Sequence, residues 1–126
     1  MIRGFENITN ELSFQEEREI LPFVIGGLKT KIGKSNSITG SEIVRKMNSF
    51  FPENGIKYKL TGVRLRKMIN YIRTRGLIEC LCSTSKGYFV GSISELEDCI
   101  ESQIQRINSQ QLVVESLERD LRSLKR

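Results

Sequence analysis

The sequence contains no histidine and no tryptophan, and it has only two prolines and three cysteines among 126 residues. Without histidine the chain cannot form a Ser-His-Asp or Cys-His catalytic system, and it lacks the side chain most used for proton transfer near neutral pH. No other constellation of residues indicates catalysis. We therefore expect a protein that is not an enzyme, has no catalytic residues, and uses neither a cofactor nor a small-molecule substrate.

The three cysteines are Cys80, Cys82 and Cys99, an odd number in a chain whose N-terminal segment lacks the apolar core of a secretory signal. This usage indicates a reduced, cytoplasmic protein. Three cysteines without histidine complete a zinc site only with a carboxylate or a second chain, so we expect no metal. Cys80 and Cys82 alternate onto one face of an expected strand, where they are interpreted as small core residues.

Long hydrophobic runs are also missing. The longest, Leu21 to Ile25, is far shorter than the roughly 20 residues of a membrane span, so no membrane association is expected. Gly33-Lys34-Ser35 resembles the end of a phosphate-binding loop, but Leu28 stands where that motif requires glycine. Residues 21–32 also have helical rather than strand spacing, so nucleotide hydrolysis is not expected.

Charge is distributed unevenly along the chain. Residues 29–86 contain 13 basic and three acidic residues, a balance of +10, whereas the whole chain carries +5. Residues 93–126 contain five basic and seven acidic residues, a balance of −2. A basic segment of this density is what a polyanionic partner requires, because Lys and Arg displace the counterions of phosphates. Its alternative interpretation is a solvated surface that aids solubility.

Capping signals and apolar spacing predict three helices in the first two thirds of the chain. Ser13 to Glu16 forms a capping box before apolar positions at helical spacing over 21–32. Pro22 either opens a second helix after one that ends near Ile20, which we favour, or kinks a single helix. A second box, Thr39 to Glu42, opens a helix that stops before Pro52, and Thr61 caps a third helix that ends at Gly76.

The remaining elements are a hairpin and a long helix. Two β-prone runs, Leu77 to Cys82 and Tyr88 to Gly91, surround a Ser/Gly turn and predict the hairpin. The box Ser94 to Glu97 opens about 30 residues without Pro or Gly, which predicts one helix. The chain thus divides into an N-terminal arm (1–12), a domain (13–92) and a C-terminal helix (93–126). Its expected class is α+β, mostly helical.

The order helix, helix, basic helix, hairpin resembles a winged helix-turn-helix domain over about Pro22 to Val90, with Ser37-Ile38 as the short strand that completes the sheet. The stretches Val63 to Arg73 and Ser85 to Tyr88 are similar to small winged-helix proteins of bacteriophages and mobile elements. The resemblance implies a DNA-binding transcriptional regulator or replication accessory factor, which acts in the cytoplasm of a bacterial host. The sequence differs from winged-helix proteins whose binding depends strongly on the wing, because the tip of its predicted hairpin contains one basic residue, Lys86.

The third helix, 61–75, is the candidate reading element. Leu65, Met68, Ile69 and Ile72 share one narrow arc and are expected to face the core. The opposite face suits the major groove, because valine can contact a thymine methyl, lysine the guanine acceptors and asparagine the adenine edge. The predicted base-facing residues are Val63, Arg64, Arg66, Lys67, Asn70 and Thr74. The predicted backbone-contacting residues are Thr39, Ser41, Lys46, Tyr71, Arg73, Arg75 and Lys86.

The C-terminal helix fits a heptad register from Leu96 to Leu124. We predict a dimer seam of Leu96, Ile100, Ile107, Val114, Leu117, Leu121 and Leu124, with Gln103 and Gln110 at d positions. Mostly β-branched a positions favour a two-stranded coiled coil and a homodimer. The alternatives are that the helix packs back on its own domain, or that it stands alone and frays.

Three functional hypotheses follow. The first is a homodimeric protein that binds double-stranded DNA through helix 61–75. The second is a winged-helix protein-interaction module that recruits a host or phage protein through the long helix. The third, binding of RNA or single strands, is disfavoured because Tyr71 is the one aromatic residue on the basic face.

Overall fold

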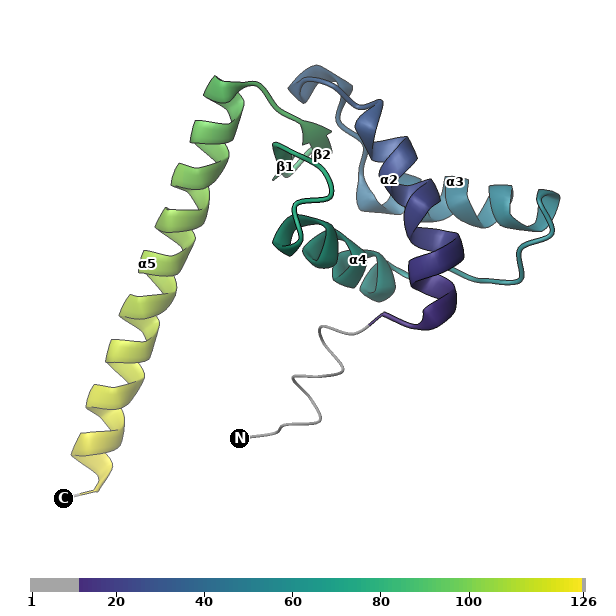
Figure 1. Ribbon diagram of the computed structural model, residues 1–126. Coiled ribbons are helices and arrows are strands. Elements are labelled where there is room, and N and C mark those ends of the chain that lie inside the picture. The colour runs from purple at the N-terminus through teal and green to yellow at the C-terminus, as the bar shows by residue number, and fades with distance from the viewer. Residues whose placement is uncertain (1–11, 126) are drawn as a thin grey trace.

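The computed structural model describes residues 12–125, and its helices surround a small antiparallel sheet (Figure 1). In chain order the elements are η1 (Glu16–Ile20), α2 (Leu21–Lys29), η2 (Lys34–Asn36), α3 (Gly40–Glu53), α4 (Gly62–Thr74), β1 (Leu81–Thr84), β2 (Gly87–Val90) and α5 (Ile93–Leu124). The expected α+β class with a long C-terminal helix is confirmed. Nearly all of the expected arm lies outside the described residues; Leu12, its last residue, packs against the core.

The first helix is continuous through the proline. The Ser13 hydroxyl accepts a hydrogen bond from the Glu16 amide (3.1 Å), and the Ser13 amide donates to the Glu16 carboxylate (2.8 Å), which confirms the first capping box. The chain then forms the π turn η1, in which the Leu21 amide bonds to the Glu16 carbonyl five residues back. This wider turn accommodates Pro22, which lacks an amide donor. The favoured break near Ile20 is therefore wrong.

The helices α3 and α4 begin where the capping signals place them. Thr39 accepts a hydrogen bond from the Glu42 amide and Thr61 from the Arg64 amide, each at 3.2 Å. The expectation that α3 stops before Pro52 is wrong, because α3 continues to Glu53. Pro52 has no amide hydrogen, so the last turn of α3 lacks one helical hydrogen bond. The helix ends at the next residue, so no further turn depends on that bond.

A side chain of α3 fixes the connection between the two helices. The Asn48 side-chain amide donates to the Leu60 carbonyl (2.9 Å), and its oxygen accepts the Leu60 amide (2.7 Å). Because Leu60 directly precedes the N-cap of α4, this pair of bonds places the start of α4 relative to α3.

The hairpin is shorter than the sequence predicts. Strands β1 and β2 pair from Leu81 opposite Val90 to Thr84 opposite Gly87. The expected strand start at Leu77 is wrong, because Gly76 (φ 63°) and Cys80 (φ 60°) turn the chain before β1 begins. Residues 77–80 are therefore an irregular link.

The outer edge of β2 pairs with the segment before α3. The Ile38 amide donates to the Tyr88 carbonyl (3.0 Å), and the Tyr88 amide donates to the Ile38 carbonyl (2.8 Å). The expected short strand at Ser37-Ile38 is thus a one-residue antiparallel bridge, and Ile32 forms a second, parallel bridge with Val90. These bridges attach the hairpin to the helical part of the domain.

The core lies among α2, α3, α4 and the sheet. Its fully buried members include Phe51, Phe89, Ile20, Leu28 and Val24. The arc of α4 that the sequence assigns to the core is confirmed, since Leu65, Met68, Ile69 and Ile72 are 0 to 3% exposed.

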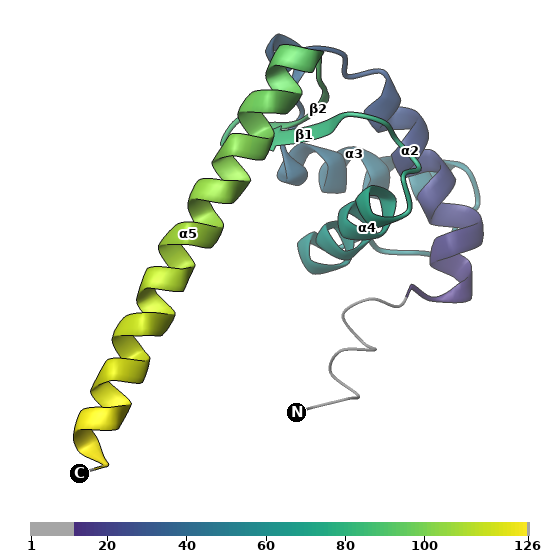
Figure 2. The same ribbon diagram turned by 60° about the vertical axis from the view of Figure 1, so that its left-hand side comes forward.

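The helix α5 stands outside this core and contains no buried residue. Both views show α5 running away from the domain (Figures 1 and 2). Its N-cap is Ser92 rather than the expected Ser94, because the Ser92 hydroxyl accepts the Glu95 amide and the Glu95 carboxylate accepts the Ser92 amide.

Candidate nucleic-acid interface

The face of α4 opposite its core arc is accessible. Val63 is 53% exposed, Asn70 and Thr74 are exposed, and Lys67 is half-buried. These four are the residues that the helical spacing places together, since positions three and four apart share a face. The Thr74 hydroxyl donates to the Asn70 carbonyl (2.9 Å), so it is already occupied within the helix.

A surface hollow adjoins the N-terminal end of this face, and we name it the α3–α4 hollow. It is lined by Gly40, Ser41, Val44, Gly62, Leu65, Arg66 and Tyr88. The Arg66 guanidinium lies over Gly62, 3.6 Å from the point where a side chain there would begin. The N-terminal ends of α3 and α4 therefore meet at one hollow that also contains a guanidinium group.

This hollow suits an anion. The first amides of a helix have no acceptor within the helix, and the helix dipole adds partial positive charge at that end. Gly40 and Ser41 contribute such amides from α3, and Arg66 contributes a full charge. A phosphate oxygen is the kind of ligand that such a combination binds.

The hairpin adjoins the hollow, because the depression that it lines shares Gly40 and Tyr88 with it. A second depression is lined by Thr39, Gly40, Ser83, Thr84, Ser85, Gly87 and Tyr88. Lys86 is exposed in the turn between β1 and β2, where its amide donates to the Thr84 hydroxyl (3.1 Å). Of the predicted backbone-contacting residues, Thr39, Ser41 and Lys86 thus lie around one pair of adjoining depressions.

The C-terminal half of α4 carries three further predicted residues, which form contacts within the protein. The Arg73 guanidinium donates to the Ser83 hydroxyl (2.9 Å) and so connects α4 to β1. The Arg75 guanidinium stacks on the Tyr71 ring at 3.9 Å, and the Tyr71 hydroxyl donates to Glu17 (3.3 Å). All three side chains are partly or fully accessible on the flanks of α4.

Arg64 does not belong to the base-facing set. Its guanidinium forms an ion pair with Glu16, with Nε donating to Oε2 at 2.7 Å. The Tyr58 hydroxyl donates to the same Oε2 at 2.5 Å, and Glu16 is 2% exposed. Because Arg64 neutralises a buried carboxylate, we leave it out of the base-facing set proposed below, and its contact with bases stays a prediction.

The electrostatics of this cluster hold all of its groups in fixed protonation states. Burial opposes ionisation of Glu16, but the hydrogen bonds from Arg64, Tyr58 and Ser13 outweigh it and lower the pKa of Glu16 to about 2. Burial, followed by the neighbouring Glu16, raises the pKa of Tyr58 to about 12. The hydrogen bond to Glu16 raises the pKa of Arg64 further. The cluster therefore joins η1 to the first turn of α4 by a permanent ion pair.

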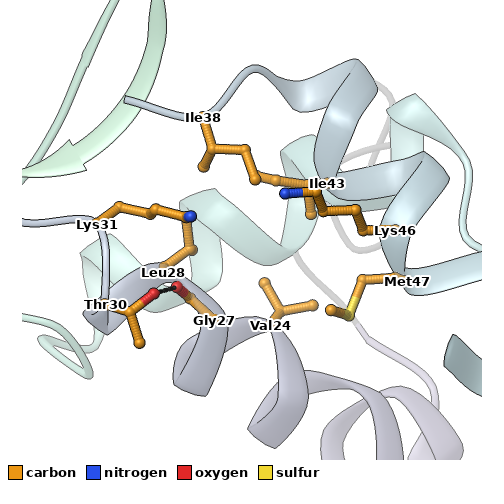
Figure 3. Close-up of a pocket in the computed structure, with 9 residues that line it drawn as sticks. All are labelled: Val24, Gly27, Leu28, Thr30, Lys31, Ile38, Ile43, Lys46 and Met47. Atoms are coloured by element: carbon orange, nitrogen blue, oxygen red, sulfur yellow. Dashed lines mark hydrogen bonds between the residues drawn. The ribbon is translucent and has the colours of Figure 1, made fainter. Parts of the chain in front are cut away.

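Lys46 also lies away from the candidate interface. It lines a cavity between α2 and α3 of about 170 Å³, together with Val24, Gly27, Leu28, Thr30, Lys31, Ile38, Ile43 and Met47. Figure 3 shows the side chains of Lys31 and Lys46 approaching this cavity from its two sides. Val44, which lines the α3–α4 hollow, is two positions earlier and points to the opposite side of α3. We therefore leave Lys46 out of the proposed backbone contacts, and its contact with DNA stays a prediction.

Charge on α4 is of one sign. Residues 61–76 contain five basic residues and no acidic residue. With Arg64 neutralised by Glu16, the accessible positive charge of α4 comes from Arg66, Lys67, Arg73 and Arg75.

The burial of Cys82 indicates a structural role for this residue. Cys82 is 1% exposed, and burial together with the neighbouring Cys99 raises the pKa of its thiol to about 12. It is therefore a protonated thiol at neutral pH and no nucleophile. Cys80 lies before β1 rather than on the same strand face, so that part of the expectation is wrong. Residues 12–125 contain no group of three or more Cys, Asp or Glu side chains placed to hold a metal ion.

No helix within the described part of the chain has the length and the hydropathy of a membrane span.

Comparison of the chain with protein-family models, with curated proteins and with solved structures gave no match. The function is therefore inferred from the residues and geometry of this chain alone.

The predicted dimer seam lies on the exposed surface of α5. Leu96 is half-buried, and the other members, Ile100, Ile107, Val114, Leu117, Leu121 and Leu124, are 47 to 83% exposed. The contacts of α5 with the domain are near its N-terminal end, where Cys99 lies against Ser83 and Glu95 accepts the Lys34 amide (3.0 Å). The alternative in which this helix packs back along its domain is wrong for residues 107–125, which are exposed apart from the half-buried Ser116.

Proposed function

We propose that this chain is a winged helix-turn-helix protein that binds double-stranded DNA, with α4 in the major groove. It acts by occupying a site, as a transcriptional regulator or replication accessory factor does. The observation that carries the proposal is the accessible face of α4, where base-reading side chains and positive charge lie beside a hollow formed by two helix N-termini. The helix α4 contains no acidic residue that would repel a phosphate backbone.

The arrangement of elements supports the winged-helix part of the proposal. Two helices joined by residues 54–61 precede a hairpin, and the edge of β2 pairs with Ile38 just before α3. This order places the hairpin beside the N-terminus of α3, as the adjoining depression shows. A hairpin in this position lies where a wing contacts the DNA backbone next to a recognition helix.

The residues then divide into two roles. Val63, Lys67 and Asn70 face the base edges, because they occupy the centre of the exposed face. Arg66, the Gly40 and Ser41 amides, and Lys86 contact phosphates and set the register of α4 on the duplex. The ion pair between Glu16 and Arg64 holds the first turn of α4 in place for this contact.

The protein-interaction hypothesis has one specific observation in its favour, the exposed apolar face of α5. Such a protein would bind protein partners with little dependence on salt and would not shift duplex DNA even at low ionic strength. An electrophoretic shift with a random-sequence duplex separates the two hypotheses.

Selection of preferred sites from random duplexes, followed by one double variant, tests the proposal. Lys67→Ala with Asn70→Ala should remove the preference for the selected duplex over a random one, because each bidentate base contact contributes about 1–3 kcal/mol of discrimination. The circular dichroism spectrum should stay unchanged, since both side chains lie outside the core.

Lys46→Ala is the matched control, because it also removes one positive charge but lies between α2 and α3. It should retain the preference. Unchanged affinity of the Lys67 and Asn70 double variant for the selected duplex, in moderate salt, would refute the assignment of α4 as the reading helix.

A further inference from the structure

The helix α5 presents an apolar stripe that its own domain does not cover. Ile100, Ile107, Val114 and Leu121 recur every seven residues along it, and each is 47 to 62% exposed. The side of α5 that meets the hairpin carries mostly polar groups, among them Glu95, Gln103 and Arg106. The domain contact therefore reaches the seam at Gln103, whereas residues 107–125 are exposed apart from the half-buried Ser116, and a partner can lie along them without displacing the domain.

We propose that the stripe is covered by a second copy of this chain, in a parallel two-stranded coiled coil of α5 with α5. A helix of 32 residues is about 48 Å long, and a solitary helix in water is marginally stable. Pairing removes the stripe from water along most of that length. Ile and Val at three of the four a positions, with Leu at the outer d positions, are the pattern that favours two strands.

The two glutamines of the seam decide the orientation. Gln103 and Gln110 both occupy d positions. In an antiparallel pair each d residue faces an a residue of the partner, and every a residue here is apolar, so all four amides would be buried without a partner in any register. In a parallel pair d faces d, and each glutamine meets the same glutamine of the partner, which can satisfy it.

The charged residues beside the seam have a smaller effect on the orientation than the glutamines, and their pairing differs between the parallel and the antiparallel pair. In the parallel pair Asp120 lies beside the partner's Lys125, and no position flanking the seam brings like charges together. An antiparallel pair can also place opposite charges together, for example Arg106 beside the partner's Asp120. Exposed ion pairs contribute less than burying an unsatisfied amide costs, so the glutamines outweigh them.

Parallel pairing has a consequence for DNA that rests on the proposed function. Both domains are attached at the same end of the coiled coil, because each joins α5 through residues 91 and 92. Two copies of α4 are therefore available to one segment of duplex, and a site with two half-sites is expected. Self-association itself does not depend on DNA binding and is tested without DNA.

Sedimentation of the full chain over a range of concentrations tests the association. The wild-type chain should sediment as a dimer, and Ile107→Asn should weaken dimerisation about a hundredfold, because it removes a buried side chain from each helix. Leu112→Asn is the matched control: Leu112 is 67% exposed on the same helix but lies off the seam, so its dimer should match the wild type. A wild-type monomer at about 100 μM would overturn the proposal and leave a different protein as the occupant.

Disulfide formation in full-length variants tests the orientation. In a parallel pair, Leu124→Cys places two thiols opposite one another, and mild oxidation should give a covalent dimer from this variant alone. The wild-type chain is the control for the three native cysteines. A covalent dimer that forms only when Leu124→Cys is mixed with Ile100→Cys, a d and an a position that face each other in an antiparallel pair, would instead overturn the parallel assignment.

Discussion

At the residue scale, Glu16 forms two sets of contacts, and the sequence indicates only the first of them. It completes the capping box with Ser13, and it receives the guanidinium of Arg64 and the hydroxyl of Tyr58. The first set was predictable, because a capping box spans three residues. The second was not, because Glu16 and Arg64 are 48 residues apart and local spacing contains no information on that pair.

We predict that Glu16→Gln lowers the free energy of unfolding by about 3 kcal/mol at neutral pH, because it leaves the Arg64 charge without its carboxylate. Urea denaturation followed by circular dichroism measures this value. An unchanged midpoint would show that the ion pair contributes nothing to stability.

The same cluster predicts a pH dependence. The pKa of Glu16 is about 2 in the folded protein and 4.5 in its ordinary state, so its contribution is complete above pH 4.5 and is lost as the pH falls towards 2. Wild-type stability should therefore fall between those values more steeply than that of Glu16→Gln, and the two proteins should converge in acid. Parallel curves for both proteins in this pH range would contradict the assignment.

At the scale of elements, the close approach of the hairpin to residue 38 is the contact that attaches the hairpin to the helices. Gly87 has φ 121°, and a side chain there would begin 2.2 Å from the Ile38 carbonyl oxygen. The helices were largely predictable, because the hydroxyls of Thr39 and Thr61 and the apolar spacing are local signals. The start of β1 was not, because Cys80 has a positive φ, which is uncommon for a residue other than glycine and is not indicated by its β-prone neighbours.

We predict that Gly87→Ala destabilises the protein by about 2–4 kcal/mol, because backbone atoms cannot move aside as a flexible side chain does. Gly26→Ala is the matched control, since nothing lies within 4 Å of that position in α2. It should stabilise the protein by about 0.5–1 kcal/mol, as expected for alanine in an exposed helix. Thermal denaturation compares the two, and equal effects would contradict the bridge between Ile38 and Tyr88.

At the scale of the whole molecule, a basic domain carries one long helix that extends away from it (Figure 2). The separation of the basic segment from a long helix was predictable from charge and periodicity. Which basic side chains face outwards was predictable only in part: Arg66 and Lys86 remain candidates, whereas Arg64 pairs with Glu16 and Lys46 lies beside the α2–α3 cavity. Burial and partner choice depend on packing between distant segments, which a helical wheel does not describe.

The most direct test of the central claim is the salt dependence of duplex binding by the full chain. Log affinity should fall linearly with log salt concentration, and Arg66→Ala with Lys67→Ala should weaken binding and reduce the slope by about 1, because Arg66 displaces about one counterion from the phosphates whereas Lys67 contacts the bases. Lys29→Ala with Lys46→Ala removes the same charge from the α2 side and should leave the slope unchanged. Equal effects of the two double variants, or no duplex binding at low salt, would contradict the assignment of α4 as the DNA-binding surface.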